Sequence, residues 1–301
     1  MVSIAWSEIY AHPLPEGHRF PMEKYTLVPE QLLYEGTITQ EQIFAPKQLS
    51  EAEILKTHDA NYWHRLSNIL LTAREQRVSG FPHSAQLIER ERIICQGTVD
   101  GAVRSINGDG CSLNIAGGTH HAYRDRAEGF CLLNDIALGA KHLLANNLAK
   151  RILVVDLDVH QGNGTASIFQ NDDRVFTFSM HGAKNYPFKK EQSDLDIGLP
   201  DGIEDEEYLD LLKSNLPRLI DHHKPDFIFF QSGVDILETD KLGKLGVSIE
   251  GCKQRDELVL SACNSKGIPL QISMGGGYSK EIKHIVEAHA NTFRLAMHYF
   301  G

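Results

Sequence analysis

The sequence predicts an α/β fold in which helices cover a single parallel sheet. Two patterns predict it. Several short segments are apolar nearly throughout, and longer segments between them carry apolar residues at intervals of three and four. Strands that are buried on both faces of a parallel sheet have the first pattern, and helices that pack on such a sheet have the second.

Strand-like and helix-like segments alternate from about residue 90 to the end of the sequence. The strand-like segments are 112–116, 151–157, 174–180, 226–231 and 269–273. The helix-like segments are 134–148, 203–222, 248–264 and 280–297. Parallel strands need crossover connections of about this length, so the order of the segments supports a parallel sheet.

The first 90 residues are more helical and irregular, with six prolines among them. No linker rich in Pro, Gly or Ser and no change in composition separates this part from the rest. Because it offers little material for a core of its own, we predict one domain over residues 1–301.

Composition narrows the classes of function. Of the 301 residues, 42% are hydrophobic and 23% charged, as in soluble globular proteins. Thirty Lys and Arg against 40 Asp and Glu give a net charge of −10, which argues against direct nucleic-acid binding. No segment reaches about 18 consecutive apolar residues and the start lacks a signal-peptide pattern, so we expect no membrane span and a cytoplasmic location, with entry to the nucleus left open.

The five cysteines are scattered and form no Cys-x-x-Cys pair, so we expect reduced thiols. Fifteen histidines are a more informative count, because imidazole is both a common metal ligand and a common acid–base group.

Polar residues and glycines follow four of the predicted strands. Ligands of parallel α/β sheets bind beyond the carboxyl ends of the strands, so these four segments are expected to meet in one pocket. The segments are 117–121, 156–164, 232–235 and 275–278.

Asp158, His160 and Asp235 form a candidate metal site. Asp158 and His160 are two positions apart in extended chain and face the same side, and Asp235 follows another strand. Two carboxylates and one imidazole suit Zn²⁺ or Fe²⁺ and leave a coordination position for water. The alternative is that the two aspartates cap helices and the histidine is structural.

His120 and His121 are candidates for the general base and the general acid of a hydrolase. Such histidines need an acceptor on the other ring nitrogen, and Asp156 and Asn163 are placed to supply it. Tyr278, after three glycines, is a candidate donor to an oxyanion. Taken singly, a pair of histidines or a tyrosine is more often structural.

Four segments together resemble the zinc-dependent histone deacetylase family, which includes acetoin-utilisation and acetylpolyamine-amidohydrolase relatives. They are LNIAGGTHHAYRDRAEGFCLLND (113–135), RILVVDLDVHQGNG (151–164), FIFFQSGVD (227–235) and PLQISMGGGY (269–278). Segment 18–25 and the residues His58, Asp59 and Tyr62 fit the amino-terminal part of the family. Segments 161–164, 235–242 and 253–258 are most similar to the class IV branch of small, single-domain enzymes.

The resemblance implies the arginase/deacetylase fold, a central eight-stranded parallel sheet flanked by helices. It assigns zinc to Asp158, His160 and Asp235, and oxyanion stabilisation to Tyr278. One zinc ion is expected, because Gly162 stands where arginases carry an Asp for a second metal. Class I relatives have an Asp at the position of Asn163, so we expect His121 to be less basic here.

The resemblance also implies a substrate channel and bound potassium. The channel would use Gly129, Phe130, Gly276, an aromatic at Tyr186 or Phe188, and Leu242 at the rim. One potassium site would use Asp156, Asp158, His160, Ser179 and Met180. A second would use Phe169, Asp172 and Val175, with a carbonyl from near Leu195.

The expected function is hydrolysis of N-acyl-lysine in proteins or peptides, with an acetyl or a longer fatty-acyl group. A small-molecule amidohydrolase that acts on acetylated polyamines is the alternative, and the acidic net charge suits either substrate. A binding or scaffold protein that lost the chemistry is a third hypothesis, which the intact set of site residues disfavours. Oligomeric state and partner complexes stay open.

Overall fold

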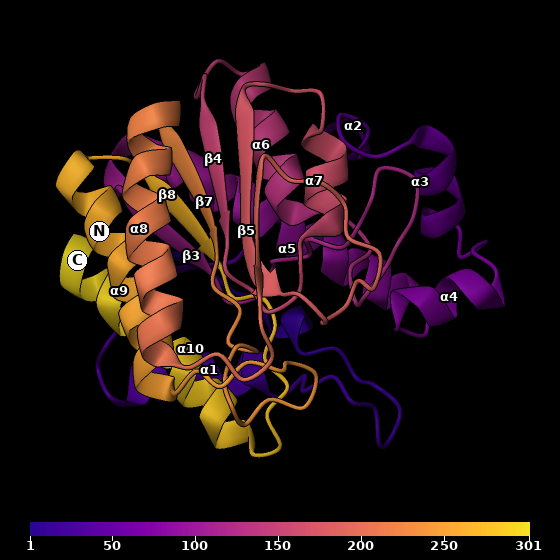
Figure 1. Cartoon of the computed structure of the whole chain (residues 1–301). Helices are drawn as coiled ribbons and strands as arrows, with labels where there is room; N and C mark the ends of the chain where they lie inside the picture. The colour runs from indigo at the N-terminus through magenta and orange to yellow at the C-terminus, as the bar shows by residue number, and fades with distance from the viewer.

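The computed structural model describes residues 1–301, apart from the side chain at position 109. An eight-stranded, all-parallel sheet with the order β2-β1-β3-β8-β7-β4-β5-β6 forms its centre (Figure 1). The strands are β1 (Ser3–Ala5), β2 (Ile43–Phe44), β3 (Cys111–Asn114), β4 (Ile152–Asp156), β5 (Val175–Gly182), β6 (Leu195–Leu199), β7 (Phe227–Gln231) and β8 (Leu270–Ser273).

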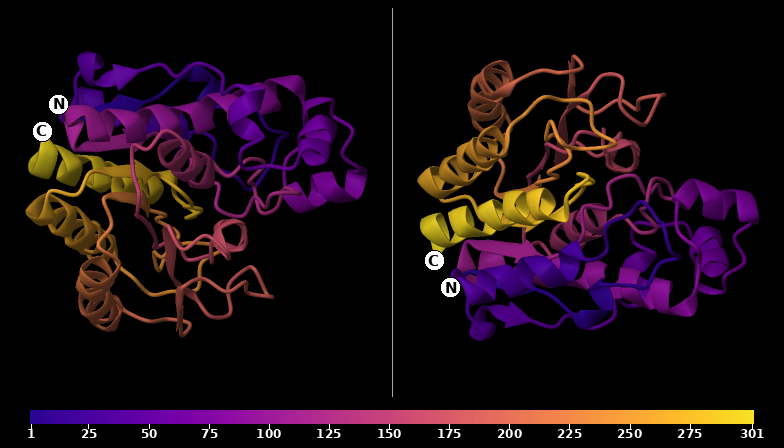
Figure 2. Two further views of the ribbon diagram at one scale, coloured as in Figure 1. Left: turned by 90° about the horizontal axis from the view of Figure 1, so that it is seen from above. Right: turned by 90° about the horizontal axis from the view of Figure 1, so that it is seen from below.

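Helices cover both faces of the sheet. The helices are α1 (Lys24–Tyr34), α2 (Glu51–Ile54), α3 (Ala60–Ser67), α4 (Ala73–Ser79), α5 (Ala85–Arg104), α6 (Asp135–Ala145), α7 (Asn163–Phe169), α8 (Asp205–His223), α9 (Ile249–Lys266) and α10 (Ile282–Phe300), with short helical turns at Glu8–Tyr10, Gln40–Gln42 and Ser105–Asp109. Helices α8, α9 and α10 form one layer and α5, α6 and α7 the other, as both views of Figure 2 show. Helix α1 packs against α10, and α2–α4 lie beyond α5 and α6.

The central strands are apolar on both faces because each face has its own core. In β4, Ile152 and Val154 belong to the hydrophobic cluster under α5–α7, whereas Leu153 and Val155 belong to the cluster under α8–α10. Successive side chains of a strand point to opposite faces, so a strand between two helical layers has to be apolar throughout.

The predicted α/β fold and its eight-stranded parallel sheet are confirmed. All five strands expected from composition are present, as are the four predicted helices, with ends that move by a few residues. The apolar pattern missed β1, β2 and β6. Strands β1 and β2 have three and two residues, and β6 is an edge strand with exposed and half-buried positions, so none of them forms an apolar run.

All five cysteines are buried. Among the described residues, no helix combines the length and the apolar character that crossing a membrane requires.

The topology brings the four glycine-rich segments together. Strands β3, β8, β7 and β4 are consecutive neighbours in the sheet, and Asn114, Ser273, Gln231 and Asp156 lie side by side at their ends. All of these strands run in the same direction, so the segments that follow them leave the sheet at one edge, the lower edge in Figure 1.

Candidate active site

Asp158, His160 and Asp235 converge at this edge. Nδ1 of His160 lies 3.1 Å from Oδ1 of Asp158 and 3.0 Å from Oδ2 of Asp235, and all three side chains are buried. Ligands of a tetrahedral Zn²⁺ with bonds of about 2.0 Å are separated by about 3.3 Å, so these atoms have the spacing of ligands to a single ion.

Backbone groups hold both carboxylates in place. The backbone N–H of Val159 donates to Oδ1 of Asp235 at 2.9 Å, and that of Gly276 donates to Oδ2 of Asp158 at 2.9 Å. A Cβ at Gly276 would overlap the carboxylate of Asp235, so this position requires a glycine. Neither aspartate caps a helix, because α7 and α9 begin after Gly162 and Ser248, and the helix-cap alternative is therefore wrong.

The electrostatics of the group favour a cation. Burial by itself lowers the pKa of His160, but hydrogen bonds with Asp158 and Asp235 outweigh burial and raise it to about 10. Burial and the charge of Asp158 raise the pKa of Asp235 to about 7. Two buried carboxylates are stable as anions only beside a positive charge, which a divalent ion supplies, so this donor set fits a metal centre.

His120 and His121 follow β3, and each has its own acceptor. Nδ1 of His120 lies 2.7 Å from Oδ2 of Asp156, and Nδ1 of His121 lies 2.6 Å from Oδ1 of Asn163. The rings are 4.2 Å apart between centroids. The structure thus pairs the two histidines one to one with the two predicted acceptors.

Glu128 and Tyr123 determine which end of the Asn163 side chain faces His121. Nδ2 of Asn163 donates to Oε2 of Glu128 at 3.2 Å and to the hydroxyl of Tyr123 at 3.0 Å, and Tyr123 donates in turn to Glu191 at 3.1 Å. The amide oxygen of Asn163 must therefore point to His121 and accept its Nδ1 proton. Nε2 of His121 is left with its lone pair, as a base requires.

The two histidines differ in charge. Burial lowers the pKa of His120, but the carboxylates of Asp156 and Asp158 outweigh it and raise this pKa to about 9. Burial and the positive charges of His120 and His160 hold the pKa of His121 well below its usual value. A cationic His120 beside a neutral His121 is the arrangement that results.

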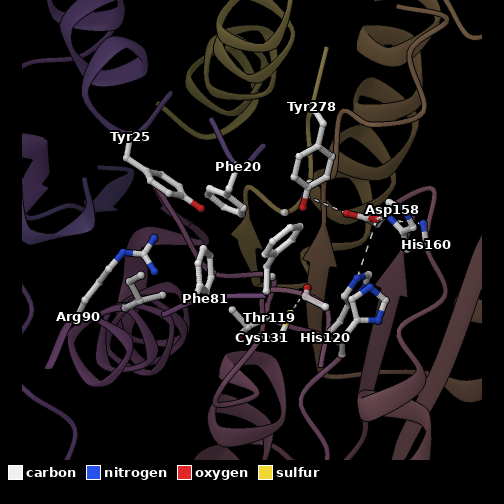
Figure 3. Close-up of a pocket in the computed structure, with 18 residues that line it drawn as sticks. Phe20, Tyr25, Phe81, Arg90, Thr119, His120, Cys131, Asp158, His160 and Tyr278 are labelled. Carbon is white, nitrogen blue, oxygen red and sulfur yellow. Dashed lines mark hydrogen bonds and ion pairs between the residues drawn. The ribbon is translucent and has the colours of Figure 1, made fainter. Parts of the chain in front are cut away.

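Tyr278 lies on the far side of the metal group. Its backbone N–H donates to Asp240 at 2.6 Å, and its ring centroid is 6.4 Å from that of His160. Burial, with the nearby charges of Asp235 and Asp158, raises the pKa of the Tyr278 hydroxyl well above its usual value, so that it stays a proton donor. Figure 3 shows Tyr278, Asp158, His160 and His120 around one cavity.

Two cavities meet at these residues. An outer cavity of about 510 Å³ opens to the surface. An inner cavity of about 40 Å³, whose lining residues are drawn in Figure 3, continues toward Tyr25 and Arg90. Both are lined by His121, Gly129, Phe130, His160 and Tyr278.

The predicted channel residues fall at different depths. Phe130 lines both cavities, and Tyr186 lines the outer one with its ring 5.1 Å from that of His121. Phe188 also lines the outer cavity but is 88% exposed, so of the two predicted aromatics only Tyr186 packs against His121. Leu242 is half-buried at the outer cavity, and Gly276 lines only the inner one.

The predicted potassium residues lie in two groups, and Asp158 and His160 of the first group also line the inner cavity. Asp156 and Ser179 are paired neighbours on β4 and β5. In the second group, the backbone N–H of Asp172 donates to the carbonyl of Phe169, and that of Val175 to the carbonyl of Asp172. The potassium sites stay predictions.

Comparison with known families agrees with this geometry. The model of the histone deacetylase domain matches residues 18–293, which span all four strand-end segments. The chain belongs to the histone deacetylase family. Among curated relatives, an uncharacterized protein of Picosynechococcus sp. is 43% identical over 287 residues and matches 95% of both chains. Histone deacetylase 2 of Arabidopsis thaliana is 29% identical over 297 residues, covering 95% of this chain and 76% of that protein.

Solved structures share the fold of this histone deacetylase family member. The crystal structure of a histone deacetylase homologue in complex with SAHA superposes with a TM-score of 0.84 at 24% identity, covering 98% of this chain and 84% of that one. The crystal structure of the HD domain of HDA15 also superposes with a TM-score of 0.84, at 20% identity.

Several buried residues around the site were not identified as candidates from the sequence. Lys24 is fully buried and donates to the carbonyl of Gly275 at 2.9 Å, and burial lowers its pKa to about 8. Arg90 forms a buried ion pair with Glu91 beside the inner cavity. Glu128 directly precedes Gly129 and Phe130 in the sequence, but only its contact with Asn163 reveals a role.

Proposed function

We propose that this chain is a zinc-dependent deacylase that hydrolyses the amide of an N-acyl-lysine in a protein or peptide. The observation that carries the proposal is the meeting of the Asp158–His160–Asp235 group, the two histidines and Tyr278 at the junction of the two cavities. A zinc ion held by this group would act as a Lewis acid and would lower the pKa of a water molecule bound to it.

The residues of the chain divide the remaining work. Nε2 of His121 accepts a proton from the attacking water, because Nδ1 carries the proton that it donates to Asn163. The Tyr278 hydroxyl donates a hydrogen bond to the oxyanion as the tetrahedral intermediate forms. His121 then returns the proton to the departing lysine amine, and the carboxylic acid product leaves. His120, whose Nδ1 lies 2.7 Å from Oδ2 of Asp156, packs beside the ring of His121 and supports it in this role.

The cavities favour a short acyl group. The lysine methylenes would pass through the outer cavity between Phe130 and Tyr186, and the acyl group would then occupy the inner cavity. The inner cavity is small, at about 40 Å³, and is lined by Arg90, which is fixed by its buried ion pair with Glu91, so a myristoyl chain would require Arg90 to move whereas an acetyl group needs far less space. We therefore propose acetyl-lysine as the preferred substrate.

The test is turnover of two peptides by the purified protein loaded with zinc. The peptides have the same neutral sequence and carry acetyl-lysine or myristoyl-lysine. We expect hydrolysis of the acetyl peptide, its loss after removal of metal by a chelator, and its return with added Zn²⁺. Absence of turnover of either peptide by the zinc-loaded protein contradicts the proposed function, and faster turnover of the myristoyl peptide contradicts the acyl preference.

A further inference from the structure

The mouth of the channel carries four cationic side chains, Arg19, Arg77, Lys184 and Lys244, which we call the cationic collar. They come from four separate segments: the one before α1, the end of α4, the connection between β5 and β6, and the connection between β7 and α9. Among the described residues that line this outer cavity, none is an Asp or a Glu.

Most of the collar charge is not neutralised within the chain. Lys184 has a distant ion pair, 3.7 Å from Nζ to Oδ2 of Asp201, and both side chains are exposed. For the described part of the chain, no ion pair involves the other three. The guanidinium of Arg19 lies over the Phe130 ring at 5.0 Å, and Nζ of Lys244 lies 3.5 Å from the carbonyl oxygen of Lys184.

The collar has the opposite sign to the protein as a whole. The net charge is −10, yet the lining of the channel mouth is positive. At physiological ionic strength, charges further apart than about 8 Å are largely screened, so a substrate at the mouth experiences the collar and not the net charge. The charge preference for substrates is therefore predicted by the positive charge at the channel mouth and not by the net charge of the whole protein.

Two exposed apolar side chains complete the mouth. Phe188 is 88% exposed and Val78 is 46% exposed, and both line the outer cavity together with the collar. An acylated amine of low molecular weight would enter the channel and leave the collar without a partner, because the four cations line the outer cavity on segments separate from those that hold the metal group. A chain that extends on both sides of the acyl-lysine reaches them.

We propose that the collar binds acidic side chains that flank the acyl-lysine of a peptide or protein substrate. This inference rests on the proposed function and names its substrate class: acyl-lysine in an acidic sequence context, in preference to basic tails or polyamines. Ion pairs at the rim of an interface mainly speed association and weaken with salt. We therefore expect the preference to appear as a lower KM for acidic peptides and to shrink as the ionic strength rises.

The experiment measures binding separately from turnover. Three acetyl-lysine peptides differ only in the two residues on each side of the lysine, which are Glu, Gln or Lys. Their affinities for the zinc-loaded Tyr278→Phe protein are measured by fluorescence anisotropy, and their kcat/KM values with the wild type. Because several exposed ion pairs, each of them weak, would act together, we expect the Glu peptide to exceed the Gln peptide about tenfold in both affinity and kcat/KM at low salt.

Charge variants locate the effect. The double variant Arg77→Gln with Lys244→Gln removes two of the four collar charges and should lower the Glu-to-Gln ratio several-fold. Lys150→Gln makes the same kind of charge change on an exposed side chain just before β4, at the opposite edge of the sheet, and should keep the ratio. Salt at about 0.5 M should remove the preference in the wild type, since the screening length then falls to a few ångströms.

Two results overturn the collar proposal. One is that the Tyr278→Phe protein binds the Glu peptide no more tightly than the Gln peptide. The other is that the Glu-to-Gln ratio is unchanged in the Arg77→Gln, Lys244→Gln variant. Tight binding of the Glu peptide without turnover of any peptide by the wild type supports the collar and contradicts the deacylase function, so the two failures are distinguishable.

Discussion

The side-chain amide of Asn163 connects His121 to Glu128: its oxygen lies 2.6 Å from Nδ1 of His121, and its nitrogen lies 3.2 Å from Oε2 of Glu128. A carboxylate is thus present in this network, but one hydrogen bond further from the histidine than a direct Asp partner would be. Tyr186 donates to the same oxygen of Glu128 at 2.8 Å, so one carboxylate orients both the base and the channel wall.

Moving this negative charge next to His121 should raise the pKa of the histidine. Asn163→Asp alone puts two carboxylates beside each other, so the informative variant is Asn163→Asp with Glu128→Gln, in which the Gln amide donates to the new Asp. Because a nearby anion favours imidazolium, we expect the acidic limb of the kcat/KM profile to move up by about one pH unit. Glu128→Gln alone is the control, and a limb that stays in place in the double variant refutes the network.

Tyr278→Phe removes the oxyanion donor and little else, because the Tyr278 backbone contact with Asp240 stays. We expect kcat to fall about 10²- to 10³-fold, with metal content and melting temperature unchanged. Tyr34→Phe is a matched control, since Tyr34 is 95% exposed, and should keep wild-type kcat. A Tyr278→Phe protein with near wild-type kcat would show that the hydroxyl has no part in the reaction.

Arg255 should determine metal affinity from beneath the site. Its guanidinium is fully buried, pairs with Asp256, and donates to the carbonyls of Leu157 at 3.1 Å and Gly233 at 2.6 Å, which adjoin the segments that carry the metal ligands. Arg255→Met leaves Asp256 as an unpaired buried charge, and we expect a loss of roughly 3–5 kcal/mol in the free energy of unfolding.

Adding Asp256→Asn to Arg255→Met removes the unpaired charge and should recover part of this stability. Zinc affinity, measured by competition with a chelator, should stay below that of the wild type in the double variant, because the carbonyls still lack their donor. Wild-type zinc affinity in that variant would limit Arg255 to a structural role.

The buried side chain of His58 should make the folded protein less stable at acidic pH. It is buried, with Nδ1 2.9 Å from the carbonyl oxygen of Tyr123 and Nε2 accepting from the backbone N–H of Asn134 at 3.0 Å. Burial lowers its pKa to about 4, although the contact with the carbonyl of Tyr123 by itself raises it. Below its unfolded pKa of about 6.5 the unfolded chain binds a proton that the folded protein excludes, so stability falls from pH 6.5 to pH 4.

The contribution of His58 to this fall is about 3 kcal/mol. Denaturant unfolding at several pH values checks it, with His58→Gln expected to show a shallower decline than the wild type. His222→Gln, which alters an exposed histidine on α8, should decline as the wild type does. Parallel declines for wild type and His58→Gln would contradict a neutral, buried His58.

The local sequence pattern was sufficient to predict the central strands of the sheet and the types of residue in the site. The strands β3, β4, β7 and β8 are buried on both faces, so their composition alone marks them, and the segments that follow them have to meet at one edge of a parallel sheet. The spacing of Asp158 and His160 likewise places both side chains on one side of an extended segment.

Only the tertiary structure decided what these residues contact. Strands β1, β2 and β6 exist because neighbouring strands provide hydrogen-bond partners at the sheet edges, and no pattern within two to five residues encodes that. The acceptor of each histidine depends on distances between segments about 40 residues apart. The sequence determined a net charge of −10, but the fold sets the sign of the charge at the channel mouth. Electrostatic interactions in salt act over only about 8 Å, so the charges that count are those near the opening. Only folding brings Arg19, Arg77 and Lys244 to the same opening.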